Sequence, residues 1–450
     1  MQKRIIIRNG KKYRVNCVGW EDGIWMPSSG TSLTAGFNYS TISDGTFITA
    51  SFTNTTVYTG TGSLIYNFNF GDGSPVTGSA NVVHYYASGS YIPKLSVTES
   101  LGNLSSSYST PIICDPYNNV LVFSGSYLAI KNPTGTVSQT NSNWKKIIGH
   151  NCVNLTTLLC NNNQLTSLNL SGSIALQTLD CSSNTLSSLN VSGSTALTYL
   201  DCNSNNSFTS LDLSTNIGLV HLYCFINQLS SLNVSGSTAL QILNCGYNIL
   251  TSLDVSTNTG LTELQCGTNP LTSLDTSANT ALQILYCGYS QLTSLDVSTN
   301  IALQTLDCSG NFIITSLNLN GALSLTHLYC NNNSLTSLVL PSYLTTYVDC
   351  SFNYFTTLEF LKDTESLTTL ICAGNQLTEL HIGGQTFLTY LDANHNNMNQ
   401  SEVDIVLFAL DINGQLDGYC DLVDGNSPPG PAGLTSKANL EAKGWSVGVS

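Results

Sequence analysis

The side chains with the widest chemical potential in this sequence are eleven cysteines in the second half of the chain. They follow one another at intervals of 20 to 22 residues. The row consists of Cys160, Cys181, Cys202, Cys224, Cys245, Cys266, Cys287, Cys308, Cys330, Cys350 and Cys372. Thiols can bind metals, form disulfides or act as nucleophiles, and they can also fill apolar space as small side chains. The spacing of the row helps to separate these roles.

That spacing disfavours metal and disulfide chemistry. Structural zinc sites need close ligand pairs such as C-x-x-C, and the row contains none. A disulfide between neighbouring repeats is conceivable, but parallel side chains in register do not present the dihedral angle that the bond requires. We therefore predict buried free thiols, with disulfides as the alternative, and neither a metal site nor a cofactor.

Residues suited to catalysis form no recognisable motif. None of the six histidines stands in an H-E-x-x-H pattern. Neither a G-x-S-x-G elbow nor a phosphate-binding G-x-x-x-x-G-K-[ST] loop occurs. The regularly spaced Asp254, Asp275 and Asp296 reflect periodicity more than an acid–base pair. We assign no catalytic residue and expect a protein that is not an enzyme.

The cysteines mark one position of a repeat that must hold them in place. One unit reads Leu155-x-x-Leu158-x-Cys160-x-x-Asn163-x-Leu165. Leu158 and Cys160 share one face of a short strand, and strands of successive coils would stack at roughly 4.8 Å. The Asn163 carboxamide can satisfy backbone groups in the turns of its own and adjacent coils. Such a fixed period predicts a solenoid, in which each repeat buries its apolar face against its neighbours.

This unit resembles the leucine-rich repeat, L-x-x-L-x-L-x-x-N-x-L, with cysteine in place of the third leucine. The resemblance covers residues 152–400 and is to the short, helix-free bacterial kind, like the cysteine-bearing internalins. An asparagine follows each cysteine by three residues except at Ser290, and a twelfth coil has Ala393 at the cysteine position. A second apolar pair, such as Leu253 and Val255, predicts a short extended stretch on the opposite wall.

Residues 1–35 form a basic arm. Six of the chain's 13 basic residues fall in its first fourteen positions. These are Lys3, Arg4, Arg8, Lys11, Lys12 and Arg14. Asn9-Gly10 lies between two alternating runs, which predicts a β-hairpin. The arm is either a solvated terminal hairpin or an anchor that docks on an acidic partner. The sequence favours neither alternative over the other.

Residues 36–115 contain short alternating runs broken by Gly, Asn and Ser, which predict a β-sandwich. The run Phe68-Asn69-Phe70-Gly71-Asp72-Gly73-Ser74 resembles the W-D-F-G-D-G-S signature of PKD domains, with Phe68 for Trp and Asn69 for Asp. The resemblance implies an immunoglobulin-like spacer or adhesion module. A calcium role for Asp72 is the lesser alternative, because a single carboxylate falls short of a cation cage.

The remaining segments flank the repeats. Residues 116–151 are predicted to link the sandwich to the solenoid and to cover its first coil with Trp144, Ile147 and Ile148. Residues 401–450 depart from the period and predict two short cap helices, the first with Ser401 as N-cap and the second with Gly444 as C-cap. The fold class is therefore mainly β: an immunoglobulin-like (PKD-type) sandwich, then a leucine-rich-repeat solenoid with a small C-terminal helical cap.

The candidate ligand-binding residues lie one and three residues before each cysteine, where side chains point outward from the strand sheet. These columns vary while the inner positions do not, as expected of a binding face on a common scaffold. The candidate face comprises Tyr199, His221, Tyr223, Phe225, Tyr286, His327, Tyr329 and Tyr347. Aromatic rings beside Asp and Asn suit glycan stacking or a protein hot spot. The alternative is that exposed tyrosine simply favours strands.

Charge and hydropathy restrict the partners. The net charge is −14, and the chain after its first fourteen residues carries 7 basic against 27 acidic residues, which disfavours nucleic acid. No segment approaches the ~18 apolar residues that span a membrane. The start of the chain also lacks the apolar run of a signal peptide.

We therefore expect a bacteriophage virion protein, such as a head or tail fibre or a decoration protein, on the virion surface. Its arm would bind a capsid or tail protein, and its repeats would bind a host-surface glycan or protein; homo-oligomerisation stays open. The alternative is a secreted or surface-anchored bacterial adhesin of internalin type. An intracellular scaffold is a third hypothesis, which accounts for free thiols but not for the PKD-like module.

Overall fold

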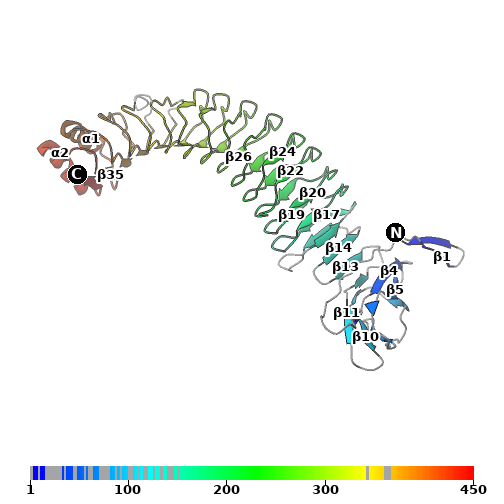
Figure 1. The fold of residues 1–450 in the computed structure, drawn as a ribbon. Helices are drawn as coiled ribbons and strands as arrows, with labels where there is room; N and C mark the ends of the chain where they lie inside the picture. The colour runs from blue at the N-terminus through cyan, green and yellow to red at the C-terminus, as the bar shows by residue number, and fades with distance from the viewer. Residues whose placement is uncertain are drawn as a thin grey trace. The chain divides into compact units, whose positions relative to one another are not determined.

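The structure, a computed structural model, describes residues 152–340, 344–358 and 366–450, together with the strands that lie between Arg4 and Gly149. It divides into two compact units. The first consists of Met1–Leu176 with Leu189–Ser194, and the second of Gln177–Ser188 with Thr195–Ser450. Figure 1 colours the first unit from blue to cyan-green and the second from green to red.

The first unit begins with antiparallel strands. β1 (Arg4–Arg8) pairs with β2 (Lys11–Val15), and Arg8 lies opposite Lys11, which confirms the predicted hairpin. Two three-stranded antiparallel sheets follow. One contains β4 (Phe37–Ser43), β5 (Ile48–Asn54) and β8 (Val82–Tyr86), and the other contains β7 (Leu64–Asn69), β10 (Lys94–Glu99) and β11 (Ser105–Ser109). The short strands are β3 (Leu33–Thr34), β6 (Val57–Tyr58), β9 (Gly89–Tyr91) and β12 (Ile112–Cys114).

Parallel pairing starts before the first cysteine of the row. The strands concerned are β13 (Val120–Ser124), β14 (Tyr127–Lys131), β15 (Gly135–Ser138), β16 (Lys146–Gly149), β17 (Leu155–Leu159) and β18 (Ser167–Asn169). β13 and β14 are antiparallel, whereas β14 with β16, β16 with β18, and β15 with β17 are parallel. Residues predicted to link the domains therefore already pair in the manner of solenoid coils.

Several predictions fall on side chains outside the described part of the chain. They concern the six basic residues of the arm, the run from Phe68 to Ser74, and the capping residues Trp144, Ile147 and Ile148.

The second unit is a parallel β-solenoid, as predicted. Each coil contributes a short strand, and equivalent residues lie opposite one another from coil to coil, as Leu200, Leu222 and Leu243 do. The sheet runs in the order β19 (Thr178–Asp180), β21 (Tyr199–Asp201), β23 (His221–Tyr223), β25 (Ile242–Asn244), β26 (Glu263–Gln265), β27 (Ile284–Tyr286), β29 (Thr305–Asp307), β31 (His327–Tyr329), β32 (Tyr347–Asp349), β33 (Thr369–Ile371), β34 (Tyr390–Asp392), β35 (Tyr419–Leu422) and β36 (Ser446–Val449). Figure 1 shows these coils one after another along the solenoid.

The opposite wall is a strand in some coils only. β20 (Ser188–Asn190) continues the sheet that contains β16 and β18. Further along, the strands of this wall are β22 (Ser210–Asp212), β24 (Ser231–Asn233), β28 (Ser294–Asp296) and β30 (Ser316–Asn318). β22 pairs with β24, and β28 pairs with β30. Leu253 and Val255 are buried as predicted, but the segment that carries them forms no strand.

The cysteine row forms the inner layer of the solenoid. Every cysteine of the row is 0% exposed, and those from Cys202 to Cys372 are free thiols. Burial raises the pKa of the Cys266 thiol to about 12, because the apolar interior cannot solvate a thiolate. The predicted burial of the row is confirmed. Burial also raises the pKa of the other cysteines from Cys202 to Cys372, which favours the protonated, less reactive form of the thiol.

In the coils that have it, the asparagine three residues after the cysteine joins adjacent coils, as predicted. Nδ2 of Asn248 donates to the carbonyl oxygens of Cys245 and of Cys224 in the preceding coil, both at 3.0 Å. Its Oδ1 accepts from the backbone nitrogen of Leu229 at 2.9 Å. One buried side chain thus satisfies backbone groups of two turns, which the interior requires.

Each coil turns through a left-handed residue two positions after its cysteine position. The φ angles lie between +49° and +65°. The residues are Asn162, Ser183, Ser204, Ile226, Tyr247, Thr268, Tyr289, Gly310, Asn332, Phe352, Gly374 and His395. Glycine and asparagine adopt this conformation readily, whereas bulky or β-branched side chains rarely do. The strained positions are therefore Ile226, Tyr247, Thr268, Tyr289 and Phe352.

Two helices and two further strands close the solenoid. The helices are α1 (Gln400–Asn413) and α2 (Pro431–Ala442). The prediction of Ser401 as N-cap is wrong. Asn399 has the extended conformation of a cap and accepts from the Glu402 nitrogen at 3.1 Å, whereas Ser401 already lies inside the helix. The prediction of Gly444 as the C-cap of α2 is wrong by one residue. The C-cap is Lys443, and Gly444, with φ +88°, supplies the left-handed turn directly after it.

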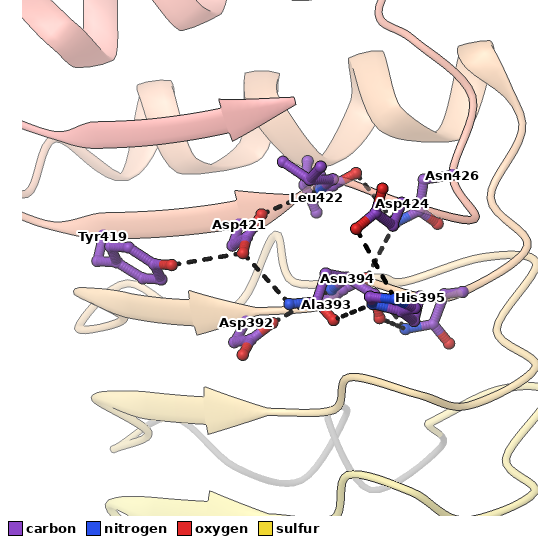
Figure 2. Close-up of polar contacts among 11 residues, drawn as sticks. Asp392, Ala393, Asn394, His395, Tyr419, Asp421, Leu422, Asp424 and Asn426 are labelled. Atoms are coloured by element: carbon purple, nitrogen blue, oxygen red, sulfur yellow. Dashed lines mark hydrogen bonds and ion pairs between the residues drawn. The ribbon is translucent and has the colours of Figure 1, made fainter. Parts of the chain in front are cut away.

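β35 and β36 continue the sheet, which the repeat pattern of the sequence does not predict. Cys420 lies opposite Leu391, and Val447 lies opposite Cys420. Asn426 takes the place of a ladder asparagine, because its Nδ2 donates to the Ala393 oxygen at 3.0 Å and to the Leu422 oxygen at 3.2 Å (Figure 2). The cap therefore extends the hydrogen-bonding pattern of the coils beyond the last repeat. Neither helix of the described chain is long and apolar enough to cross a membrane.

Candidate binding face

The candidate face is the outward side of the strand sheet. In β21 and β23 only the middle residue is buried, and the residues on either side are partly exposed. Parallel register then places Tyr199 beside His221, and Asp201 beside Tyr223. The outward columns predicted from the sequence therefore form continuous rows across the coils.

The first predicted aromatic cluster is brought together on β21 and β23. The rings of Tyr199 and Tyr223 lie 5.7 Å apart at 47°, and those of Tyr199 and His221 lie 6.2 Å apart at 75°. Edge and tilted arrangements of this kind are favourable for aromatic pairs. Phe225 lies past the strand, where its carbonyl oxygen accepts from the Ser204 nitrogen at 3.0 Å. It belongs to the turn and not to the sheet face.

The second cluster forms on β31 and β32. The ring of Tyr347 is 4.8 Å from that of Tyr329 and stacks on His327 at 5.9 Å and 19°. Burial, followed by the charge of Asp349, raises the pKa of Tyr347 to about 12. Tyr286, the remaining predicted residue, lies on β27 between Gln265 and Asp307 of the adjacent strands. It is therefore flanked by polar side chains and stands apart from both clusters.

A third aromatic pair was not predicted. Tyr390 and Tyr419 stack with ring centroids 4.7 Å apart and planes at 20°. Both residues have the offsets of the outward columns, since Tyr390 lies three residues before Ala393 and Tyr419 directly precedes Cys420. The regular cysteine series ends at Cys372, so the repeat pattern does not extend to these two tyrosines. Figure 2 shows Tyr419 directed at Asp421, which also accepts from Asn394.

Carboxylates accompany the rings along the same face. Asp349 exemplifies their local role, because its Oδ1 accepts from the backbone nitrogen of Ser351 at 3.0 Å and so shapes the turn. Burial raises the pKa of Asp201, Asp349 and Asp392, with smaller contributions from neighbouring carboxylates. The two outward columns contain no Lys or Arg. The face is therefore aromatic and anionic.

Among the described residues, no group of three His, Cys, Asp or Glu side chains is placed to hold a metal ion. The residues on the face can stack, accept hydrogen bonds and present negative charge. This chemistry is that of a recognition surface.

Similar solved structures are leucine-rich repeat proteins. The functional domain of InlJ from Listeria monocytogenes, which includes a cysteine ladder, is 29% identical to this chain with a TM-score of 0.50, covering 64% of each chain. YopM from Yersinia enterocolitica WA-314 is 22% identical with a TM-score of 0.48, covering 65% of this chain and 69% of that one. The internalin InlF from Listeria monocytogenes str. 4b F2365 is 16% identical with a TM-score of 0.39, covering 73% and 89%.

The likeness to InlJ, together with the repeat and its ladders, defines the class of the second unit as a leucine-rich-repeat solenoid. This chain spans 64% of the length of the InlJ chain that it matches. No protein-family model and no curated protein matches the sequence.

Proposed function

We propose that this chain is a binding protein without catalytic activity, and that its outward sheet face recognises a protein or glycan on a cell surface. The observation that carries the proposal is the contact between rings of successive coils, Tyr199 with Tyr223 and Tyr329 with Tyr347. Tyrosine provides large contact area at low cost in side-chain entropy. Rings already packed against one another lose little further freedom when a partner covers them.

A bacterial surface adhesin of internalin type is the first form of this proposal. The cysteine ladder shared with the InlJ domain supports it, and InlJ is 29% identical over the matched region. In this form the protein is extracellular or held at the bacterial surface, and the coils present the aromatic face to a host molecule.

Display on a bacteriophage virion, as a head or tail fibre or a decoration protein, is the second form. The β1–β2 hairpin supports it, because this hairpin carries five of the six basic residues proposed to dock on a capsid or tail protein. In both forms we propose that residues 36–115 are a PKD-like spacer. The antiparallel sheets β4-β5-β8 and β7-β10-β11 support an immunoglobulin-like module there.

The test is cell binding by a double variant, Tyr223→Ser with Tyr329→Ser. Fluorescently labelled protein is titrated onto cultured epithelial cells and onto bacterial cells, and bound protein is measured by flow cytometry. We expect binding to at least one cell type, and a loss of about tenfold or more in the double variant, since each tyrosine anchors one cluster. Tyr354→Ser, which removes an exposed tyrosine outside the sheet face, is the matched control.

Circular dichroism and urea midpoints establish that both variants are folded. Equal binding by the double variant and the wild type would exclude this face as the site. If the wild type bound to neither the epithelial nor the bacterial cells, cell adhesion itself would be excluded.

A further inference from the structure

The asparagine ladder is broken at one cysteine-bearing coil, where Ser290 replaces the asparagine. In neighbouring coils the carboxamide accepts from the backbone of the preceding coil, as Asn269 does from Leu250 at 2.9 Å and Asn311 from Leu292 at 3.1 Å. Serine is too short to make the equivalent bond to Leu271. Ser290 is only 8% exposed, and its buried hydroxyl has no hydrogen-bond partner. A buried polar group without a partner is costly, so its presence calls for an explanation.

A hollow lies at this break. Its volume is about 240 Å³, and it opens on the turns that follow β26 and β27. Its lining consists of Thr268, Asn269, Pro270, Tyr289, Ser290 and Gln291. Clefts for drug-sized ligands begin at roughly 300 Å³, so this hollow fits a single ring-sized group. The lining contains hydroxyls, amides, an aromatic ring and a proline, and none of its side chains is charged.

Tyr289 forms one wall of the hollow in a conformation that bulky residues avoid. Its φ is +54°, and it is 61% exposed. Its ring lies against Gly310 of the next coil, where a Cβ atom would come within 2.8 Å of Tyr289 Cδ1. The glycine thus leaves room for the ring and limits its movement. Strained, exposed and pre-positioned side chains are typical of ligand sites.

We propose that this hollow binds one ring of a neutral glycan. The ring of Tyr289 and the pyrrolidine of Pro270 provide an apolar surface for the C–H face of a sugar. The hydroxyl of Thr268 and the amides of Asn269 and Gln291 can both donate and accept, which matches sugar hydroxyls. A sugar hydroxyl would also give Ser290 the partner that it lacks.

The uncharged lining disfavours phosphate, sulfate and uronic acid groups, because it has no cation to offset their desolvation. Tyr247 occupies the same turn position two coils earlier and is exposed, so it can contact a further ring of a longer glycan. The site lies on the turns and is separate from the sheet face that carries the proposed function.

The experiment uses the full chain and defined probes. Neutral hexasaccharides of glucose, mannose, galactose and N-acetylglucosamine are compared with heparin-derived and polygalacturonate oligosaccharides and with a neutral hexapeptide. Binding is measured by isothermal titration calorimetry and saturation-transfer-difference NMR. We expect at least one neutral hexasaccharide to bind, and the charged oligosaccharides and the peptide not to bind.

Two variants test the location. Ser290→Asn restores the ladder and fills the hollow, and Tyr289→Asn removes the ring with a residue that tolerates the left-handed conformation. Each is expected to weaken binding about tenfold or more, with a urea midpoint equal to or above that of the wild type. Phe352→Asn is the matched control, because Phe352 lies against Gly374 as Tyr289 lies against Gly310, and it should leave binding unchanged.

Several results would overturn the proposal. They are the absence of neutral-glycan binding at millimolar concentration, a preference for the charged probes or the peptide, and undiminished binding in both Ser290→Asn and Tyr289→Asn. Loss of glycan binding in the Tyr223→Ser, Tyr329→Ser variant, with no loss in the turn variants, would assign the glycan to the sheet face instead.

Discussion

The side-chain amide of Asn227 donates a hydrogen bond to the carbonyl oxygen of Cys202, one coil earlier, at 3.1 Å. The same nitrogen donates to the Cys224 oxygen at 2.9 Å, while Oδ1 accepts from the backbone nitrogen of Asn205 at 2.7 Å. A single buried side chain therefore joins the turns of two coils. Repeated along the solenoid, this contact holds the register on which the outward rows depend.

Replacement of Asn227 by alanine should destabilise the solenoid strongly. The change leaves the Asn205 N–H and the Cys202 carbonyl buried without this partner, and each such group costs about 1–3 kcal/mol. We expect the free energy of unfolding, measured by urea denaturation, to fall by about 3 kcal/mol.

Asn233→Ala is the control, because Asn233 is exposed. Its Oδ1 accepts from Ser235 of its own turn and its Nδ2 donates to Asp212 of the preceding coil at 3.0 Å, so both contacts lie at the solvent-exposed surface. Its effect should stay below about 1 kcal/mol. Equal losses in the two variants would show that the ladder contributes no special stability.

Alkaline pH should destabilise the protein through its thiols. The folded pKa of Cys266 is about 12, against an ordinary value of 9.0. Between these values the folded thiol keeps its proton while the unfolded one releases it, so the stability present below pH 9 is lost as the pH rises toward 12. Urea midpoints should therefore fall above pH 9. A variant with Cys245, Cys266 and Cys287 replaced by alanine should show a shallower fall than the wild type, and an identical slope would contradict this account.

The same burial should protect the row from thiol reagents. Maleimide at pH near 8 is expected to label few cysteines of the native protein and most of them after denaturation, because the thiolate is the reactive form and is disfavoured inside the solenoid. Mass spectrometry of the labelled peptides reports each site. Fast native labelling of many cysteines of the row would refute the inner placement.

A larger residue in place of Gly418 should destabilise the C-terminal cap. A Cβ atom at this position would collide with the ring of Trp445, which is buried and donates from Nε1 to the Gln415 oxygen at 2.8 Å. Overpacking of this kind costs about 1–3 kcal/mol. We expect Gly418→Ala to lower the urea midpoint and to alter the near-ultraviolet circular dichroism of the tryptophan.

Gly383→Ala is the matched control, because a Cβ there would have no neighbour within 4 Å. It should change the free energy of unfolding by less than about 0.5 kcal/mol. A loss at Gly383 as large as that at Gly418 would mean that glycine flexibility, and not the Trp445 contact, is responsible.

The repeating part of the fold was predictable because its signal is repeated. The positions of Cys160 and Asn163 recur coil after coil, so the inner placement of the cysteines and the role of the asparagines between turns could be predicted. Both are confirmed, the second by bonds such as that from Asn248 to the Cys224 oxygen one coil earlier. The Ser401 cap was wrong because Asn399, two residues earlier, is equally suited by type and is the one that adopts cap geometry. The pairing of β35 and β36 does not follow the period of the repeats, so the sequence pattern does not predict it.

The candidate face also has one part that the sequence predicts and one part that it does not. The Tyr199 and Tyr347 clusters followed from equal offsets on neighbouring strands, where register alone brings side chains together. The Tyr390–Tyr419 stack did not, because the whole of α1 lies between the two residues in sequence.

The sequence by itself determined which side chains point inward and which point outward, because strand alternation and a constant period are local properties. Only the tertiary structure decided what the serine at position 290 does to the packing of the coils. The hollow, the unpartnered hydroxyl and the position of Tyr289 against Gly310 arise where consecutive coils stack. Their physical cause is the packing of residues on different coils, which no single repeat contains.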